Sequence, residues 1–170
     1  MKIKDASIED IAGILEIYNH AVVNTTAIWN ESTVDIANRI AWMEGRRAAG
    51  YPVLVAVNEE NQVLGYASFG DWRAFDGYKY TVEHSVYVHH AMQRGGVGKA
   101  LMQALVVRAQ QLGKHVIVAA IEAGNAPSIQ LHRQLGFAET GYMREVGTKF
   151  GRWLDLVFMQ LMVPQGKESP

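Results

Sequence analysis

The stretch VYVHHAMQRGGVGKALMQAL places three glycines and two cations between an apolar run and a helical one. These residues are Arg94, Gly95, Gly96, Gly98 and Lys99. Glycine lets the backbone approach a ligand closely, and successive N–H groups at a helix N-terminus favour negative charge. We therefore expect the loop to bind an anion; the alternative is a glycine-rich strand-to-helix turn without a ligand.

Two familiar phosphate-binding motifs do not fit this loop. A P-loop needs glycine where Gln93 lies and Ser or Thr where Ala100 lies. A dinucleotide fingerprint needs a third glycine at the position of Leu101. We therefore expect a different arrangement to bind the anion.

A carboxylate precedes the loop, on a segment with strand character. Glu83 lies in TVEHSVYV, where alternation places Glu83 and Ser85 on one face and His84 and Val86 on the other. A carboxylate on so apolar a strand is unusual in a core. Glu83 is therefore a candidate general base. The alternative is a solvent-facing glutamate on a one-sided sheet.

The histidines near this strand do not suggest a metal centre. His84, His89 and His90 cluster with Glu83, but adjacent residues of an extended chain point opposite ways. The helical spacing typical of zinc ligands is absent from the sequence. We expect no bound metal.

The elements that must position these residues follow from periodicity and from caps. We expect helices over 11–23, opened by a capping box of Ser7 and Asp10, and over 34–48, capped by Thr33. The remaining expected elements are a strand at 2–5, a hairpin over 52–72, a strand over 80–88, a helix over 98–113, a strand over 115–122, a helix over 125–136, and two strands around KFGRW between 137 and 163. The alternating order predicts one mixed α/β domain over residues 1–163, with a loose tail at 164–170.

Composition excludes several classes of protein. The 170 residues carry a net charge of −1 and show no basic stripe, so we expect no nucleic-acid partner. No apolar run approaches the length of a membrane span, and the N-terminus has no apolar signal region, so we expect no membrane partner and a cytoplasmic protein. Cysteine is absent, which excludes disulfides, thiolate metal ligands and a cysteine nucleophile.

The loop and a second segment together resemble the GNAT superfamily of acetyl-CoA-dependent N-acetyltransferases. Residues 93–98, QRGGVG, match the pattern Q/R-x-x-G-x-G/A of its pyrophosphate loop. Residues 125–137, NAPSIQLHRQLGF, resemble its N-x-x-S-x-x-L-[YH]-x-x-x-G-F segment. The resemblance covers almost the whole chain. It implies the GNAT fold, a mixed and mostly antiparallel sheet flanked by helices, with strands splayed at the acetyl-CoA site.

Longer segments, including GYASFGDWRAFDGYKYTVEHSVYV and VGTKFGRWLDLVFMQ, resemble the phosphinothricin and methionine sulfoximine N-acetyltransferase branch. That resemblance implies direct acetyl transfer to the α-amino group of a small amino-acid-like acceptor, without an acetyl-enzyme. A polyamine, an aminoglycoside or a protein N-terminus is the alternative acceptor within this fold. A non-catalytic acetyl-CoA-binding module is the alternative outside enzymes.

The resemblance also assigns residues to sites. Glu83 would be the general base, acting directly or through water. His132 stands where many GNAT enzymes have a tyrosine, and would protonate the leaving thiolate or hold the sulfur; the alternative is a surface or satisfied core histidine. The acetyl-CoA residues would be Val86, Tyr87, Val88, Gln93, Arg94, Gly95, Gly96, Val97, Gly98, Lys99, Asn125 and Ser128.

Acceptor recognition would fall to residues on both sides of Glu83. Arginine forms a bidentate fork with a carboxylate, which makes Arg73 the candidate for the acceptor's carboxylate. The expected substrate-binding residues are Trp29, Arg73, Ala74, Phe75, Tyr78, Glu83, His84, Ser85 and Lys149. The alternative for each aromatic is core or interface packing. For Asn125 the alternative, compatible with ligand binding, is a helix cap. A homodimer follows from the resemblance alone.

Overall fold

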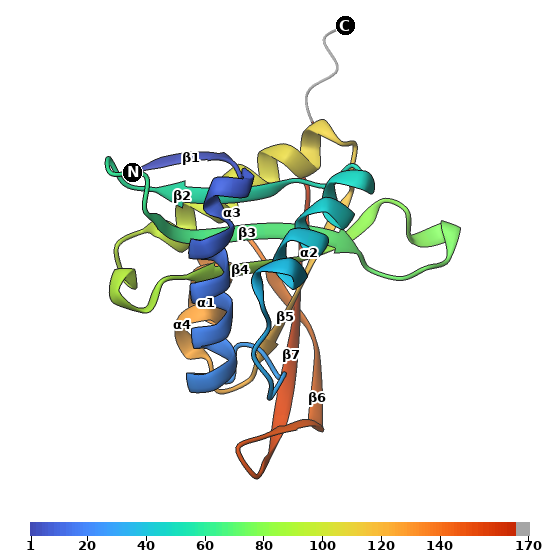
Figure 1. Ribbon diagram of the computed structural model, residues 1–170. Helices are drawn as coiled ribbons and strands as arrows, with labels where there is room; N and C mark the ends of the chain where they lie inside the picture. The colour runs from blue at the N-terminus through green and yellow to red at the C-terminus, as the bar shows by residue number, and fades with distance from the viewer. Residues whose placement is uncertain (166–170) are drawn as a thin grey trace, which may run out of the picture.

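The computed structural model describes residues 1–165, which fold around one seven-stranded sheet (Figure 1). The strand order is β1-β2-β3-β4-β5-β7-β6. Every neighbouring pair is antiparallel except β4 and β5, which are parallel. The strands are β1 Lys2–Asp5, β2 Val53–Val57, β3 Val63–Asp71, β4 Thr81–Val88, β5 Val116–Glu122, β6 Ala138–Lys149 and β7 Arg152–Met162.

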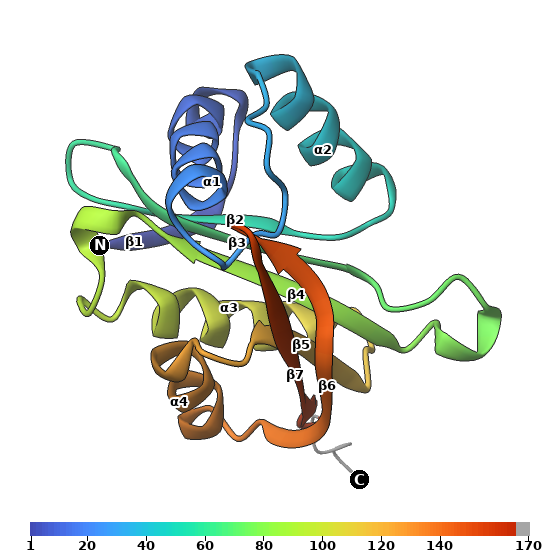
Figure 2. The ribbon, with the colours of Figure 1, turned by 90° about the horizontal axis from the view of Figure 1, so that it is seen from below.

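Four α-helices cover the two faces of the sheet (Figure 2). Helices α1 (Ile11–Asn24) and α2 (Ile36–Ala48) lie on one face, and α3 (Val97–Gln111) and α4 (Ala126–Gln134) on the other. Each pair buries an apolar cluster against the sheet, including Tyr66 on the α1/α2 face and Phe69 on the α3/α4 face. The expected order of helices and strands and the mixed sheet are confirmed.

Local capping explains most of the helix boundaries. The Ser7 N–H donates to the Asp10 carboxylate at 2.7 Å, before the short 3-10 turn Ile8–Asp10 that leads into α1. The cap expected for α2 is wrong: Asp35, not Thr33, accepts from the Asn38 N–H at 2.9 Å. Both types cap helices well, and Asp35 lies immediately before the first helical turn.

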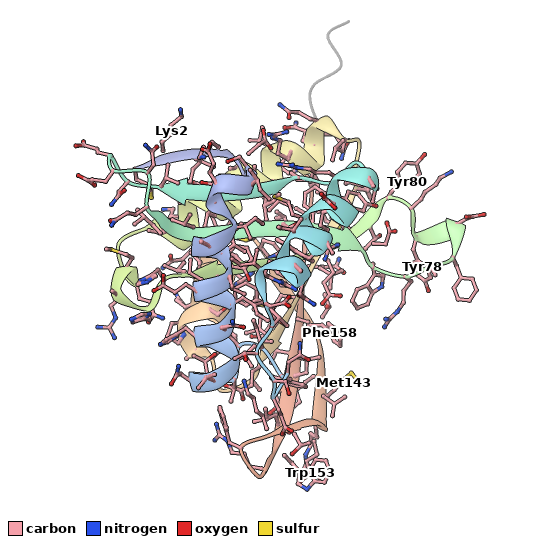
Figure 3. The ribbon with its side chains drawn as sticks, in the orientation of Figure 1. Lys2, Tyr78, Tyr80, Met143, Trp153 and Phe158 are labelled. Carbon is pink, nitrogen blue, oxygen red and sulfur yellow. The ribbon has the colours of Figure 1, made fainter. Side chains whose placement is uncertain are left out.

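Two segments extend away from the body of the sheet (Figure 3). The β3–β4 connection, with the 3-10 turn Asp76–Tyr78, exposes Phe75 and Tyr78. The distal part of the β6–β7 hairpin exposes Tyr142 and Trp153. Of the loose tail expected at 164–170, residues 166–170 lie outside the described residues.

Candidate active site

The sheet opens between β4 and β5. Parallel pairing joins Thr81, Val82 and Glu83 to Val116, Ile117 and Val118, and it stops there. Beyond that point β4 pairs only with β3, and β5 only with β7. The expected splayed strands are therefore confirmed.

A cavity of about 240 Å³ occupies this opening. Most of its walls are the facing edges of the two strands and the N-terminal part of α4. The lining residues are Ala27, Glu83, His84, Ser85, Val86, Tyr87, Ala119, Ala120, Ile121, Glu122, Asn125, Ser128 and His132. Backbone N–H and C=O groups along the separated edges have no neighbouring strand and can bind an extended ligand as a strand would.

The glycine loop lies between β4 and α3, after the 3-10 turn His90–Met92. Gly96 caps α3 with a left-handed φ of 79°, which glycine adopts without strain. The first helical bond runs from the Ala100 N–H to the Gly96 carbonyl at 3.0 Å. The N–H groups of residues 97–99 are therefore free to face an anion.

Gly98 brings α3 close to the neighbouring elements. A Cβ at this position would lie 3.4 Å from both the Leu131 and the Val88 side chains. The helix N-terminus is thus packed against α4 and the end of β4, next to the opening. The arrangement fits a cofactor whose phosphates meet the loop and whose arm runs along β4.

Glu83 lies at the last position of β4 that pairs with β5. Its side chain is half-buried and lines the cavity. Burial raises the pKa of Glu83, whereas the nearby positive charges of Arg73 and Arg46 act to lower it. The predicted alternation holds, because Val86 packs in the α3/α4 cluster while Tyr87 packs in the α1/α2 cluster. Glu83 and Ser85 therefore face the α1/α2 side.

His84 and His132 form a buried pair on the other face. Their Nε2 atoms lie 2.9 Å apart, and the His132 Nδ1 lies 2.7 Å from the Ser128 carbonyl oxygen. A carbonyl only accepts, so the neutral His132 carries its proton on Nδ1 and its Nε2 must accept from the His84 N–H. Burial lowers the pKa of His84 to about 3 and also lowers the pKa of His132. Both rings are therefore neutral near pH 7.

This pairing bears on the role expected for His132. In the neutral pair its only proton points at Ser128, and its other nitrogen is occupied by His84. The geometry thus leaves neither His132 nitrogen free to donate a proton to a thiolate, and either role expected for His132 requires the pair to rearrange. It leaves the buried Nδ1 of His84 without a partner among the described residues.

Asn125 and Ser128 both line the cavity. The Asn125 side chain accepts from the Ser128 N–H at 3.2 Å, so it caps α4 as its alternative interpretation requires. A capping asparagine still has its amide N–H groups to offer a ligand.

Of the residues expected to recognise the acceptor, Glu83, His84 and Ser85 line the cavity, whereas the others do not. Arg73 is exposed, with its guanidinium 4.3 Å above the Trp72 ring, yet close enough to act on Glu83. Ala74, Phe75 and Tyr78 lie in the exposed β3–β4 connection, and Phe75 is 79% exposed. Trp29 packs on β6, where a Cβ at Gly147 would meet its ring at 2.1 Å.

Lys149 is also directed away from the cavity. Its side chain is 1% exposed, and its ammonium donates to the carbonyls of Thr25 at 2.6 Å and of Ile28. These carbonyls follow the C-terminus of α1, where a cation is favourable. The structure does not bring this side chain to the acceptor, so a contact with substrate stays a prediction.

Sequence patterns miss Arg46, which the structure brings to Glu83 from α2. The one available signal is Gly70, because glycine inside a strand marks a close approach by another group. Residues 1–165 contain no group of three or more histidine, aspartate or glutamate side chains placed to hold a metal.

An anion-binding helix N-terminus beside two parted parallel strands, with a half-buried carboxylate at their junction, is the architecture of a CoA-dependent N-acyltransferase. Residues 14–137 match the model of the acetyltransferase (GNAT) family, and the chain belongs to this family.

Three comparisons refine this assignment. The chain is 58% identical to L-methionine sulfoximine/L-methionine sulfone acetyltransferase of Pseudomonas paraeruginosa, over 99% of this chain and 98% of the relative. It is 36% identical to phosphinothricin N-acetyltransferase of Streptomyces viridochromogenes, over 94% and 86%. A Salmonella typhimurium acetyltransferase solved with its cofactor acetyl-CoA is 57% identical, covers 100% of this chain with 98% of its own, and superposes with a TM-score of 0.94. The resemblance to this branch is confirmed.

Proposed function

We propose that this chain transfers the acetyl group of acetyl-CoA directly to the α-amino group of a small amino-acid-like acceptor such as methionine sulfoximine or methionine sulfone. The observation that carries the reaction is Glu83, half-buried where β4 and β5 part. The acceptor is supported by the similarity, over nearly the full length, to the methionine sulfoximine/sulfone enzyme. Phosphinothricin is a further acceptor suggested by the more distant relative.

Acetyl-CoA supplies an activated acetyl group as a thioester. Its pyrophosphate would lie on the N–H groups of residues 97–99, with Gln93, Arg94, Gly95, Gly96 and Lys99 around it. Its arm would run along the unpaired edge of Val86, Tyr87 and Val88, held also by Asn125 and Ser128. A backbone N–H of that edge would stabilise the negative charge that develops on the thioester oxygen.

Glu83 takes a proton from the acceptor's ammonium group, directly or through water. The amine then attacks the thioester carbon, a C–N bond forms, and the C–S bond breaks with CoA leaving as its thiolate. His132, kept neutral by its burial, lines the cavity and would lie near the departing sulfur. After the attack the nitrogen loses a second proton, so that of the two protons released one passes to the thiolate and the other, from Glu83, to solvent.

Arg73 is exposed beside Glu83 and is the group best suited to bind the acceptor's carboxylate. The exposed aromatics of the β3–β4 connection and the β6–β7 hairpin suit an interface, and we propose a homodimer in which a second copy covers them. Residues 1–165 contain no helix long and apolar enough to cross a membrane. A cytoplasmic location remains a prediction from the sequence.

A thiol-release assay with acetyl-CoA and a panel of amines tests the proposal. The chain has no cysteine, so the protein adds no thiol background. We expect turnover on methionine sulfoximine and methionine sulfone, and its loss when their carboxylate is esterified. Turnover confined to spermidine, an aminoglycoside or a peptide would replace the acceptor. Binding of acetyl-CoA without turnover on any amine would favour an acceptor outside the panel or the non-catalytic acetyl-CoA-binding module instead.

A further inference from the structure

Gly70 leaves a space beside Glu83 that Arg46 fills. Gly70 and Glu83 are directly opposite partners in the antiparallel pair of β3 and β4. A Cβ built on Gly70 would lie 1.5 Å from Nη1 and 2.7 Å from Cζ of Arg46. The guanidinium therefore occupies the place that a side chain at residue 70 would take.

This position brings the Arg46 charge near the Cβ atom of Glu83. Opposite residues of an antiparallel pair point to the same face and hold their Cβ atoms about 4.5–5.5 Å apart. Arg46 reaches this face from the last turn of α2, and its side chain is partly buried there. A partly buried charge is screened less by solvent than an exposed one.

Several other groups face Glu83. Tyr87 follows Glu83 on the same face of β4. Asp71, which accepts from the Tyr51 hydroxyl, lies on the opposite face of β3 but attracts Arg46 more strongly than Glu83 does. Arg73 approaches from the β3–β4 connection, but it is exposed and stacked on Trp72. Arg73 acts on Glu83 more strongly than Arg46 does, but Arg46 is the partly buried one of the two, with its guanidinium seated over Gly70 opposite Glu83.

We infer that Arg46 is a positioning residue for the general base: seated over Gly70, it keeps the Glu83 carboxylate ionised and oriented while Arg73 binds the acceptor. This inference rests on the role of Glu83 in the proposed function. The pKa of Glu83 agrees, since burial raises it and the charges of Arg73 and Arg46 oppose that rise. In this arrangement Arg46 acts on the general base and Arg73 binds the acceptor.

The test is the pH dependence of kcat/KM for Arg46→Gln and for Gly70→Ala, which displaces the guanidinium without removing it. A carboxylate that loses a neighbouring cation binds its proton more tightly, so the acidic limb should move to higher pH in both variants. We expect a loss of kcat/KM of about tenfold at a pH below the limb and a much smaller loss above it. Arg46→Lys keeps a positive charge, so its acidic limb should lie closer to that of the wild type.

Arg108→Gln removes the same charge from α3, on the opposite face, and should leave the limb in place. Acetyl-CoA binding and thermal unfolding of each variant establish that it folds. An unmoved limb in both Arg46→Gln and Gly70→Ala, or a rise in KM for the acceptor at every pH, would overturn the inference.

Glu83→Gln distinguishes a failure of the proposed function from a failure of the inference about Arg46. If this variant keeps wild-type turnover and pH profile, the proposed role of Glu83 fails first. If it loses turnover while the Arg46 and Gly70 variants keep the wild-type limb, only the inference about Arg46 fails.

Discussion

Glu83 is the residue on which the chemistry depends most directly. Glu83→Gln keeps the size and the polarity of the side chain but cannot accept a proton from the amine. We expect kcat to fall by about 10²- to 10⁴-fold, with the affinity for acetyl-CoA unchanged. Steady-state kinetics and calorimetric titration check both parts; unchanged turnover across the pH range would contradict the assignment.

The pH profile follows from the direction of the Glu83 pKa. The base works in its ionised form, and burial raises its pKa above the usual value for a glutamate. The acidic limb of kcat/KM should therefore lie above the pH at which an exposed glutamate titrates, and the limb should disappear in Glu83→Gln. This profile is measured under the same conditions as the Arg46 series.

The pair of histidines predicts a dependence of stability on pH. Unfolded histidine binds a proton below about pH 6.5, whereas folded His84 resists protonation down to about 3. The free energy of unfolding should therefore fall as pH drops through that window, by up to about 1.4 kcal/mol per pH unit for each such group. Urea unfolding at several pH values should show a shallower fall in His84→Phe.

Two further variants complete the test of the pair. His115→Gln removes an exposed histidine and should retain the wild-type slope. His84→Leu leaves the buried Nε2 of His132 unpaired and should cost about 1–3 kcal/mol beyond the loss of packing. The double variant with His132→Leu should be more stable than the sum of the single losses predicts; simple additivity would contradict the hydrogen bond.

Sequence motifs located single residues that line the cavity but missed their long-range partners. Glu83 lies on the strand that leads into the glycine loop, and Asn125 and His132 lie within the segment 125–137. All three line the cavity. The contact of His84 with His132 joins residues 48 positions apart. That contact, like the seat of Arg46 over Gly70, depends on which strand and helix become neighbours, and no local pattern carries this information.

At the scale of the elements, a variant of Lys149 distinguishes a structural role of this side chain from a role in substrate binding. Its ammonium binds carbonyls at the end of α1, so Lys149→Met should leave them buried and unpaired. We expect a loss of about 2–4 kcal/mol in the free energy of unfolding, with KM for the acceptor little changed at a temperature where the variant is folded. A large rise in KM with stability retained would show instead that Lys149 binds substrate.

Periodicity and caps predicted nearly every element, because these signals are local. Pro127 in the first turn of α4 and Gly136 just beyond it marked that helix correctly. The cap of α2 was wrong because Thr33 and Asp35 are both good capping residues only two positions apart. The Asn19 side chain bonds both the N–H and the carbonyl of Val34, which holds Val34 in the loop before α2, and spacing alone does not reveal this contact.

At the scale of the whole molecule, exposed aromatic groups predict self-association. Trp153 is 67% exposed and Phe150 is 56% exposed near the end of the β6–β7 hairpin. Such side chains are more often covered by a partner than left in water. We expect a homodimer by light scattering coupled to size exclusion, and a shift toward monomer in Trp153→Ser; a wild-type monomer at micromolar concentration would contradict this.

The parting of β4 and β5 has a consequence beyond catalysis. An apoenzyme must leave two stretches of backbone to be hydrated, and a ligand that binds them adds its binding free energy to that of folding. The increment reaches about 2.7 kcal/mol at a ligand concentration a hundred times the dissociation constant. Thermal unfolding with and without acetyl-CoA measures it. In a cell the amount of surviving enzyme would then follow the supply of its donor: when acetyl-CoA is scarce, proteolysis removes the chain soonest.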